Sequence, residues 1–403
     1  MLHHHIARCF TTYSTSRQIQ IKSTLLAVTY LILVATVWVA YLTSLDLNIK
    51  NVYQRSCPVQ GAVTIKVKGQ LSTLDLDDSE FSVADSSLYK RTFDAADLIY
   101  PPFGEDDGTF VAVTNLLITP NQTRGRCPQT TDSAKAKCTL DKDCVKGKTG
   151  PSYDGVLTGK CFKDSGQCEM SSWCPVESSS LPLKGNRALL KDVANFTVLI
   201  KNSVEFPECG KDLHYRNIKN KSSSDYLEKC LHSVGEDDHC PILRLGDVVT
   251  WSGEDFSKVA TLGALFKIEL KWECDFDGLT SNVCFPKYIF ERMDEANSSI
   301  APGFNFRTSF YHEENRRTLV KMYGIKFLIV VSGQGKKFDF LQLVLAFGAN
   351  IALFDLAPLV CDTLFHFLCY LKRFTPFKKH FGDFSSKARY ADRSLAEDEP
   401  EQG

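Results

Sequence analysis

The sequence lacks the short motifs that mark the common catalytic and metal sites. It contains no GxxxxGK phosphate loop, no GxSxG nucleophile turn, no HExxH and no set of His, Cys and Asp residues at metal-ligand spacing. A block of basic residues is also absent, and the formal net charge is -1, so nothing points to nucleic acid. We therefore expect no catalysis, no cofactor, no metal and no nucleic-acid partner.

Charge is scarce in two long apolar stretches. Residues 25–45 carry no charged side chain, and residues 338–361 are mostly apolar but hold Asp355 deep inside. About 20 apolar residues suffice for a helix to cross a bilayer, so we predict membrane-spanning helices at residues 24–46 and 338–362. The first is too long for a signal peptide. For the second, the alternative is a buried helix of a soluble core.

Basic residues flank both stretches and predict the orientation of the chain. They are Arg8, Arg17 and Lys22 before the first helix and Lys372, Arg373, Lys378 and Lys379 after the second. Positive flanks favour the cytoplasmic side of a membrane. This predicts an integral protein of the plasma membrane, in contact with lipids, with cytoplasmic termini (residues 1–23 and 363–403) and an extracellular segment (residues 47–337).

Cysteines and glycosylation sequons are concentrated in the predicted extracellular segment. Most of the 15 cysteines lie there, as do the four sequons at Asn121, Asn195, Asn220 and Asn297. Both features are typical of an oxidising, extracellular environment. The fold class expected is a membrane protein with two transmembrane helices that flank a large, disulfide-rich, mainly β extracellular domain.

One part of this segment, residues 127–174, has six cysteines and little apolar material. Such a unit cannot bury a core and needs disulfides to hold it. Zinc is the alternative, but the intervals lack a paired CxxC pattern. Two more pairs, Cys230 with Cys240 and Cys274 with Cys284, would close short loops. Spacing does not decide whether Cys57 and Cys209 pair or stay free.

Period-two alternation of apolar residues predicts β-strands elsewhere in the segment. It occurs in residues 63–68, in residues 196–201 and in residues 266–272, and residues 318–332 form a run longer than an average strand. In residues 196–201 the pattern puts Phe196, Val198 and Ile200 inward and Thr197 and Leu199 on the other face. In residues 63–68 it puts both lysines on one face.

Four cations on these predicted strands are the strongest candidates for a binding site: Lys66, Lys68, Arg307 and Lys321. Taken singly, each is typical of a solvated strand face. Taken together, convergent Lys and Arg donors can bind a polyanion such as a triphosphate.

The motifs around these residues resemble a known family. They are Tyr13-x-Thr15-x-Arg17, Val67-Lys68-Gly69, Thr114-Asn115, Asn121-Gln122-Thr123, Leu157-Thr158-Gly159, Trp173-Cys174-Pro175-Val176-Glu177, Asn195-Phe196-Thr197, Leu199-Ile200-Lys201-Asn202, Cys240-Pro241-Ile242, Arg244-Leu245-Gly246, Lys271-Trp272-x-Cys274, Pro302-Gly303-Phe304-Asn305-Phe306-Arg307, Tyr323-Gly324-Ile325 and Lys337-Phe338-Asp339. The chain resembles the ATP-gated ionotropic purinergic receptors over nearly its whole length.

The resemblance implies a trimeric, non-selective cation channel for Na+, K+ and Ca2+ that assembles from identical or related subunits. Its ligand would be ATP, free or as Mg-ATP, bound between two subunits. The ligand-binding residues implied are Lys66, Lys68, Thr197, Leu199, Leu227 and Ile242 on one side and Asn305, Phe306, Arg307 and Lys321 on the other. The disulfides implied are Cys127–Cys174, Cys138–Cys161, Cys144–Cys168, Cys230–Cys240 and Cys274–Cys284. The expected pore residues are Leu341, Gly348, Ala349, Ala352 and Asp355.

Four residues depart from the family pattern: Cys57, Cys209, Asp355 and Pro358. A ring of three Asp355 carboxylates would attract cations, whereas a protonated or hydrogen-bonded Asp355 would not affect permeation. Two other functions remain as alternatives. A two-span channel of another family would not need the four cations, and an ecto-enzyme acting on nucleotides would need acid, base or metal residues beside them.

Overall fold

The computed structural model describes residues 24–46, 53–101, 108–129, 137–150, 153–178, 180–210, 213–218, 224–277, 284–296, 302–345, 348 and 356–373. It divides into two compact units. One contains residues 56–337, and the other combines residues 1–55 with residues 338–403. Each is described by itself.

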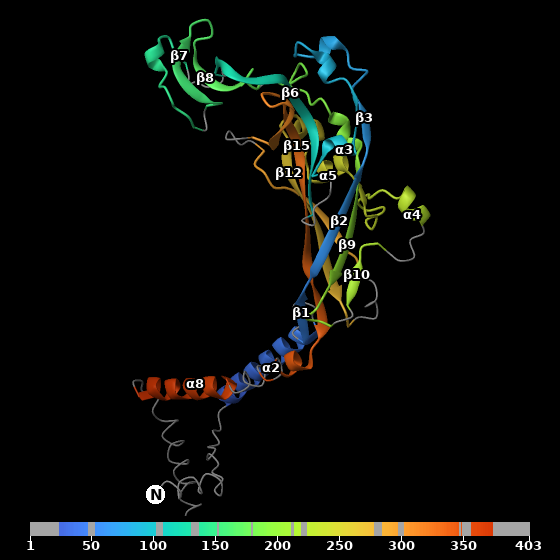
Figure 1. The fold of residues 1–403 in the computed structure, drawn as a ribbon. Helices are drawn as coiled ribbons and strands as arrows, with labels where there is room; N and C mark the ends of the chain where they lie inside the picture. Colours follow the sequence, from blue (N-terminus) through green and yellow to red (C-terminus); the bar gives the residue numbers. More distant parts are fainter. Residues whose placement is uncertain are drawn as a thin grey trace, which may run out of the picture. The chain divides into compact units, whose positions relative to one another are not determined.

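A nine-stranded sheet forms the larger part of the first unit (Figure 1). Its strands are β1 (Gln54–Pro58), β5 (Ile99–Tyr100), β6 (Thr109–Pro128), β7 (Val156–Phe162), β8 (Gln167–Cys174), β12 (Ala264–Asp275), β13 (Lys287–Arg292), β14 (Asn305–Glu313) and β15 (Arg316–Phe338). The order is β13-β12-β15-β6-β8-β7, and β1 and β14 pair with β15 while β5 pairs with β6. The β12–β15 pair is parallel. The long run predicted at residues 318–332 is therefore the middle of β15.

A four-stranded sheet joins β2 (Gln60–Lys68), β9 (Thr197–Glu205), β10 (His214–Arg216) and β11 (Ile242–Arg244). A two-stranded sheet joins β3 (Gln70–Ser72) and β4 (Thr92–Asp94). The short helices of this unit are α3 (Ala95–Leu98), α4 (Ser224–Lys229), α5 (Leu245–Trp251) and α6 (Phe256–Leu262), with single 3-10 turns at Asp78–Glu80, Ser86–Leu88, Asp141–Asp143 and Lys191–Asn195.

The main hydrophobic core combines inward side chains of both larger sheets. Phe196, Val198 and Ile200 are at most 1 % exposed, and Phe266 and Phe327 are fully buried. The alternation predicted from the sequence at residues 63–68, 196–201 and 266–272 is confirmed, because each run is a strand with its apolar residues turned inward. The outward residues of these strands are thereby held on rigid elements, which positions any site that they form.

A buried polar contact also joins the two sheets. The indole of Trp272 donates to Oδ1 of Asn202 at 2.7 Å, and Asn202 Nδ2 donates to the carbonyl of Ala62 at 3.0 Å. Asn202 is 3 % exposed. Burying an amide without partners is costly, so this pair stabilises one arrangement of β12 against β9 and β2.

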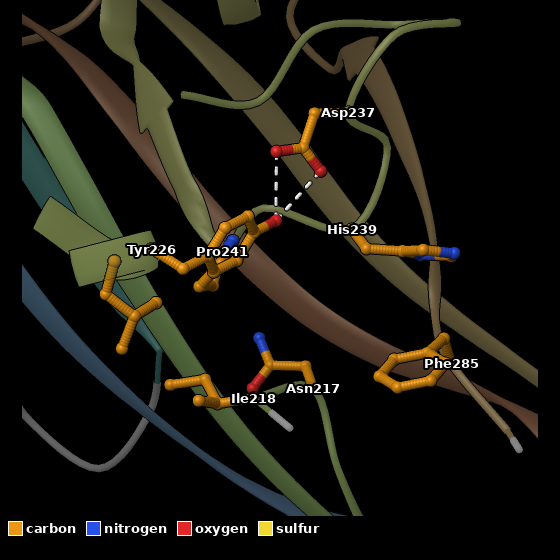
Figure 2. A pocket seen from close by; sticks show the side chains of 8 residues that line it. Asn217, Ile218, Tyr226, Asp237, His239, Pro241 and Phe285 are labelled. Carbon is orange, nitrogen blue, oxygen red and sulfur yellow. Dashed lines mark hydrogen bonds between the residues drawn. The ribbon is translucent and has the colours of Figure 1, made fainter. Parts of the chain in front are cut away.

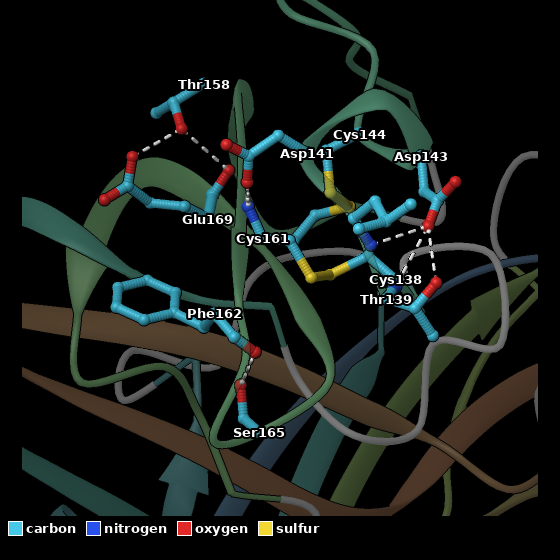
Figure 3. The surroundings of a disulfide bond; sticks show 12 residues. Cys138, Thr139, Asp141, Asp143, Cys144, Thr158, Cys161, Phe162, Ser165 and Glu169 are labelled. Carbon is cyan, nitrogen blue, oxygen red and sulfur yellow. Dashed lines mark hydrogen bonds between the residues drawn. A yellow bond between two sulfur atoms is a disulfide. The ribbon is translucent and has the colours of Figure 1, made fainter.

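Disulfides hold the cysteine-rich residues 127–174, the head. The pairs Cys127–Cys174, Cys138–Cys161 and Cys144–Cys168 are formed there, and Cys230–Cys240 and Cys274–Cys284 close two loops elsewhere. These are the five pairings that the resemblance implies. Carboxylates support the head as well, since Asp141 accepts from the amide of Cys161 at 2.8 Å (Figure 3).

A sixth disulfide, Cys57–Cys209, answers the question that spacing left open. It joins β1 to the segment after β9 across 152 residues, with a Cα–Cα distance of 5.7 Å. Both cysteines pack in a second core cluster with Phe206 and Trp272. A disulfide that closes so long a loop stabilises the folded state by about 2–4 kcal/mol.

The second unit is helical. It contains α2 (Thr24–Asp46), a helical turn at residues 340–345 and α8 (Leu356–Arg373). Asp339 caps the turn, because its Oδ1 accepts from the amides of Leu341 at 2.8 Å and Gln342 at 3.3 Å. The amide of Asp339 also donates to the carbonyl of Tyr53 at 3.1 Å. Within the described part of the chain, no helix is both long and apolar enough to span a membrane.

The helix α8 extends beyond residue 362, where we placed the end of the second transmembrane segment. It continues to Arg373, and the residues TLFHFLCYLKR that follow Asp362 are compatible with a helix. The membrane boundary at residue 362 stays a prediction. Pro358 lies in the first turn of α8, where a missing amide donor is tolerated.

Candidate functional site: two groups of cations on two sheets

The first group of candidate residues lies on the outer face of the four-stranded sheet. Lys66 is opposite Leu199 and Lys68 is opposite Thr197 in the β2–β9 register. Leu199 is in turn opposite Ile242 of β11. Residues opposite one another in a sheet point to the same face. Two lysines and three less polar side chains therefore share one surface, which we call the lysine face.

The sequence explains why the lysine face faces outward. Ile65 and Val67 alternate with the lysines and pack against the main core, so Lys66 and Lys68 are exposed. Gly69 follows directly, and a Cβ atom at this position would lie 2.2 Å from the ring of Phe196. Only glycine allows this close approach of the chain to the buried ring. The Val67-Lys68-Gly69 motif is thus a packing feature as well as a source of charge.

Leu227 lines a small cavity that also includes Pro241, the residue before Ile242 of β11. The cavity has a volume of about 270 Å³ and is lined by Leu227, Tyr226, Asp237, Pro241 and other side chains (Figure 2). The hydroxyl of Tyr226 donates to Asp237 at 2.9 Å, and burial together with this carboxylate raises the pKa of Tyr226 to about 12. The carbonyl of Pro241 accepts from the amide of Ile200 at 2.9 Å, which ties the cavity to β9.

The second group of candidate residues lies on β14 and β15 of the nine-stranded sheet. Arg307 is opposite Lys321, and Asn305 is opposite Tyr323. Gly303 begins the approach to β14 with φ +73, and a Cβ there would lie 2.1 Å from the carbonyl of Leu262. The Pro302-Gly303-Phe304 motif therefore brings Asn305 and Arg307 into register.

A carboxylate joins the two cations of this second group. Glu177 accepts from Arg307 Nε at 2.6 Å and from Arg307 Nη2 at 3.0 Å, and its Oε1 lies 3.0 Å from Lys321 Nζ. The side chains of Glu177 and Lys321 are only 16 % and 12 % exposed. A bidentate contact of this kind is among the strongest that a guanidinium makes. We call Arg307, Lys321 and Glu177 the ion triad.

Contacts within the triad shift the pKa values of all three groups so that the charged form of each is favoured. Burial opposes ionisation of Glu177, but hydrogen bonds from Arg307 and Lys321 outweigh it and lower its pKa. The hydrogen bond from Glu177 raises the pKa of Arg307. Burial opposes the charge on Lys321, yet hydrogen bonds to Tyr323 and Glu177 leave its pKa raised. The triad is fully charged at neutral pH.

The geometry bears on one residue that was predicted to contact the ligand, Phe306, and on one that was not predicted, Glu177. Phe306 was expected to contact the ligand, but it packs against the main core and lies 5.2 Å, between ring centroids, from Tyr100. Alternation along β14 puts it on the face opposite Arg307. Glu177 had no predicted role, since 130 residues separate it from Arg307 and no local pattern marks such a contact.

The expected pore and glycosylation residues are only partly described. Leu341 is 63 % exposed, Gly348 is helical, and Ala349, Ala352 and Asp355 lie outside the described residues. Asn121 and Asn195 are exposed, while Asn220 and Asn297 lie outside the described residues. Clustered sulfurs at Cys138, Cys144 and Cys161 belong to disulfides and so offer no thiolate to a metal.

Comparison with known proteins agrees with this architecture. A family model described as "ATP P2X receptor" matches residues 11–381. Human P2X purinoceptor 5 is 33 % identical over 91 % of this chain and 81 % of its own length, and bovine P2X purinoceptor 4 is 34 % identical over 80 % of each.

Solved structures give the same result. An invertebrate P2X receptor from the Gulf Coast tick, crystallised with ATP and Zn2+, superposes with a TM-score of 0.73 at 35 % identity and covers 84 % of this chain and 99 % of its own. The chicken ATP-gated P2X7 receptor channel with the competitive antagonist TNP-ATP superposes with a TM-score of 0.67 at 32 % identity, over 85 % and 99 %.

The fold and the two groups of cations define a class: a membrane receptor with a disulfide-rich, mainly β extracellular domain. Within that class, the chain belongs to the P2X receptor family.

Proposed function

We propose that this chain is a subunit of a trimeric cation channel that opens when extracellular ATP binds between subunits. The observation that carries the proposal is the placement of four cations on two outward-facing strand pairs, Lys66 and Lys68 on one sheet and Arg307 and Lys321 on the other. The resemblance to receptors crystallised with ATP or an ATP analogue supports it. The chain acts as a receptor and not as an enzyme.

Charge explains why the site needs two subunits. A triphosphate carries about four negative charges near neutral pH, and convergent cations are needed to offset them. In one chain, the lysine face and the ion triad belong to different sheets, and the described lining of the cavity beside Arg307 does not include Lys66 or Lys68. We therefore assign the lysine face of one subunit and the Arg307–Lys321 pair of the next to a single phosphate chain.

Each cation then has a distinct role in binding. Lys66 and Lys68 would bind the phosphates as exposed point charges, and Thr197, Leu199 and Ile242 would hold the base on the same face, with Leu227 near the ribose. Arg307 would bind two phosphate oxygens through its fork, with Asn305 and Lys321 beside it. Phosphate oxygens would replace the Glu177 carboxylate, because one guanidinium edge cannot serve both.

Binding opens the channel only if ATP binds the open state more tightly than the closed state. The strands that carry the cations continue along the chain into helices: β2 and β1 follow α2, and β15 leads to the turn capped by Asp339. Movement of these strands would be passed to the helices by chain connectivity. Leu341, Gly348, Ala349, Ala352 and Asp355 remain the predicted pore lining.

The test is whole-cell recording from cells that express the chain. We expect an inward current on ATP application, carried by Na+ and Ca2+ and absent from untransfected cells, and a trimer on native electrophoresis. A channel that reaches the surface in normal amounts and gives no current at saturating ATP contradicts the proposal. A current that starts without ATP, or under another stimulus alone, would favour a two-span channel of another kind.

A further inference from the structure

Beside the ion triad lies a cavity that is lined by a cationic side chain with no role in the proposed ATP site. Its volume is about 440 Å³, and its lining includes Glu177, Arg307 and a further arginine, Arg317. A second cation in such a cavity can bind a further anionic group, since guanidinium groups recognise carboxylates and phosphates. The inference below rests on the proposed ATP site and concerns which nucleotides that site accepts.

Arg317 is held in place by two contacts. Its guanidinium carbon lies 4.3 Å from the centroid of the Trp173 ring, and its Nε donates to Gln122 Oε1 at 2.9 Å. Gln122 is itself 2 % exposed and donates to the carbonyl of Pro175 at 2.8 Å. A cation stacked on indole and fixed by a buried amide is already oriented before a ligand arrives, which reduces the entropy lost on binding.

The terminal nitrogens of Arg317 differ from those of Arg307. Within the described part of the chain, neither terminal nitrogen of Arg317 has a hydrogen-bond or ion-pair partner, whereas Arg307 donates to Glu177. Asp154 also lines the cavity, but Gln129 donates a hydrogen bond to its carboxylate. Arg317 is therefore an oriented cation whose two terminal nitrogens are available to donate hydrogen bonds to a ligand.

The strand register puts Arg317 in line with the proposed phosphate contacts. Arg307 is opposite Lys321, and Tyr311 is opposite Arg317 in the same antiparallel pair. Even spacing along a strand keeps Lys321 and Arg317 on one face, and four residues correspond to roughly 13 Å. A phosphate chain anchored at Arg307 and Lys321 and running into the cavity would reach Arg317 only if it were longer than that of ATP.

We propose that Arg317 binds the outer phosphates of nucleotides with more than three phosphates, so that this channel prefers extended nucleoside polyphosphates over ATP. Arg317 is then a specificity-determining residue of the ATP site. The step is binding only and involves no covalent change. Direct charge-assisted contacts to one more phosphate group should raise potency by about tenfold.

The experiment compares current responses to ATP, adenosine 5′-tetraphosphate and adenosine 5′-pentaphosphate in the full-length channel. In the parent channel we expect the half-maximal concentration to fall as the phosphate chain lengthens. In Arg317→Gln the advantage of the longer nucleotides should vanish, with the ATP response shifted by less than about threefold. Arg316→Gln is the matched control, because Arg316 is adjacent, exposed and paired with Glu313 at 2.7 Å.

Each other outcome overturns the inference. If Arg317→Gln keeps the preference for the longer nucleotides, Arg317 does not bind the outer phosphates. If it shifts ATP and the longer nucleotides equally, Arg317 only fixes Trp173 and the head to β15. If Arg317→Gln fails to reach the surface, Arg317→Met replaces it; methionine keeps an unbranched side chain beside Trp173 but removes the charge, and an undiminished preference for the longer nucleotides in that variant contradicts the inference. If no nucleotide opens the parent channel, the proposed function itself is wrong.

Discussion

The two groups of cations differ in their state before any ligand arrives. Lys66 and Lys68 are exposed, and among the described residues their ammonium groups have no ion-pair partner. Arg307 and Lys321 share the carboxylate of Glu177, and the side chain of Lys321 is 12 % exposed. Water solvates the first pair, whereas the second pair is partly removed from water and needs an internal counter-ion.

This difference predicts different energetics for one ligand. Binding a phosphate at the lysine face replaces water around flexible side chains. Binding a phosphate at Arg307 and Lys321 must also break contacts to Glu177. We therefore expect the lysine face to contribute its full phosphate interaction to affinity, and the triad to contribute only the excess of phosphate over carboxylate binding. On this proposal, Glu177 would lower the resting affinity for ATP and keep the two cations oriented.

The largest effect is expected from removing both exposed lysines. Lys66→Ala with Lys68→Ala should raise the half-maximal ATP concentration by a factor of a hundred or more, because each charge-assisted contact is worth about 1.5–3 kcal/mol. Current measurements with surface labelling would check this. Lys287→Ala, an exposed lysine on the edge strand β13, is the control and should change the response little. A normal response in the double variant would remove these lysines from the site.

Single substitutions in the triad should have the next largest effect. Arg307→Ala or Lys321→Ala should each raise the half-maximal ATP concentration by about tenfold. The loss is smaller than for the lysine pair because one cation is removed instead of two, and because the variant has one contact fewer to Glu177 to break. Concentration–response curves in cells with matched surface expression would check this. Arg316→Ala serves as the control, and an equal shift in that variant would mean that long-range charge alone is responsible.

A smaller effect of opposite sign is expected at the counter-ion. Glu177→Gln keeps the size of the side chain but removes its charge and one of its two acceptor oxygens, so ATP should act at a concentration several-fold lower. Current onset should be faster as well. Glu313→Gln is the matched control, since Glu313 pairs with the exposed Arg316. A rightward shift in Glu177→Gln would show that Glu177 helps to bind the ligand rather than competing with it.

The smallest effect is expected from pH. Because the pKa of Glu177 lies below its usual range, its charge is complete above that range and is lost only as pH falls through the lowered value. The ratio of half-maximal ATP concentrations between parent and Glu177→Gln should therefore stay constant between about pH 6 and about pH 8. Taking the ratio cancels the titration of ATP itself. A ratio that changes steeply in this range would place the pKa of Glu177 near neutrality.

Sequence patterns predicted the elements that carry the site better than the contacts within it. Alternation predicted that Lys66 and Lys68 lie on the outer face of one strand and Thr197 and Leu199 on the outer face of another. The β2–β9 register shows that these two faces form one continuous surface. The same alternation argues against Phe306 as a ligand contact. Phe306 was predicted to contact the ligand because it lies between Asn305 and Arg307 in the family motif. Glu177 and Arg317 meet their partners only after the head folds against β15, so long-range contacts of that kind leave no local pattern.

The cysteines illustrate the same limit. Short loops made Cys230–Cys240 and Cys274–Cys284 predictable from spacing, whereas Cys57 and Cys209 are 152 residues apart and meet only in the folded sheet. The helix α8 runs to Arg373, beyond the predicted end of the transmembrane segment at residue 362, because Asp362 interrupts the apolar run without ending the helix.

A double-mutant cycle tests the central claim most directly: the two groups bind one phosphate chain, but only the triad has to release a counter-ion. ATP responses would be measured for Arg307→Ala and Lys68→Ala, each with and without Glu177→Gln. The account predicts that Arg307→Ala is more damaging in the Glu177→Gln background, with a coupling of about 1 kcal/mol or more, whereas Lys68→Ala costs the same in both backgrounds. Equal coupling of Glu177 to both residues, or no coupling to Arg307, would contradict it.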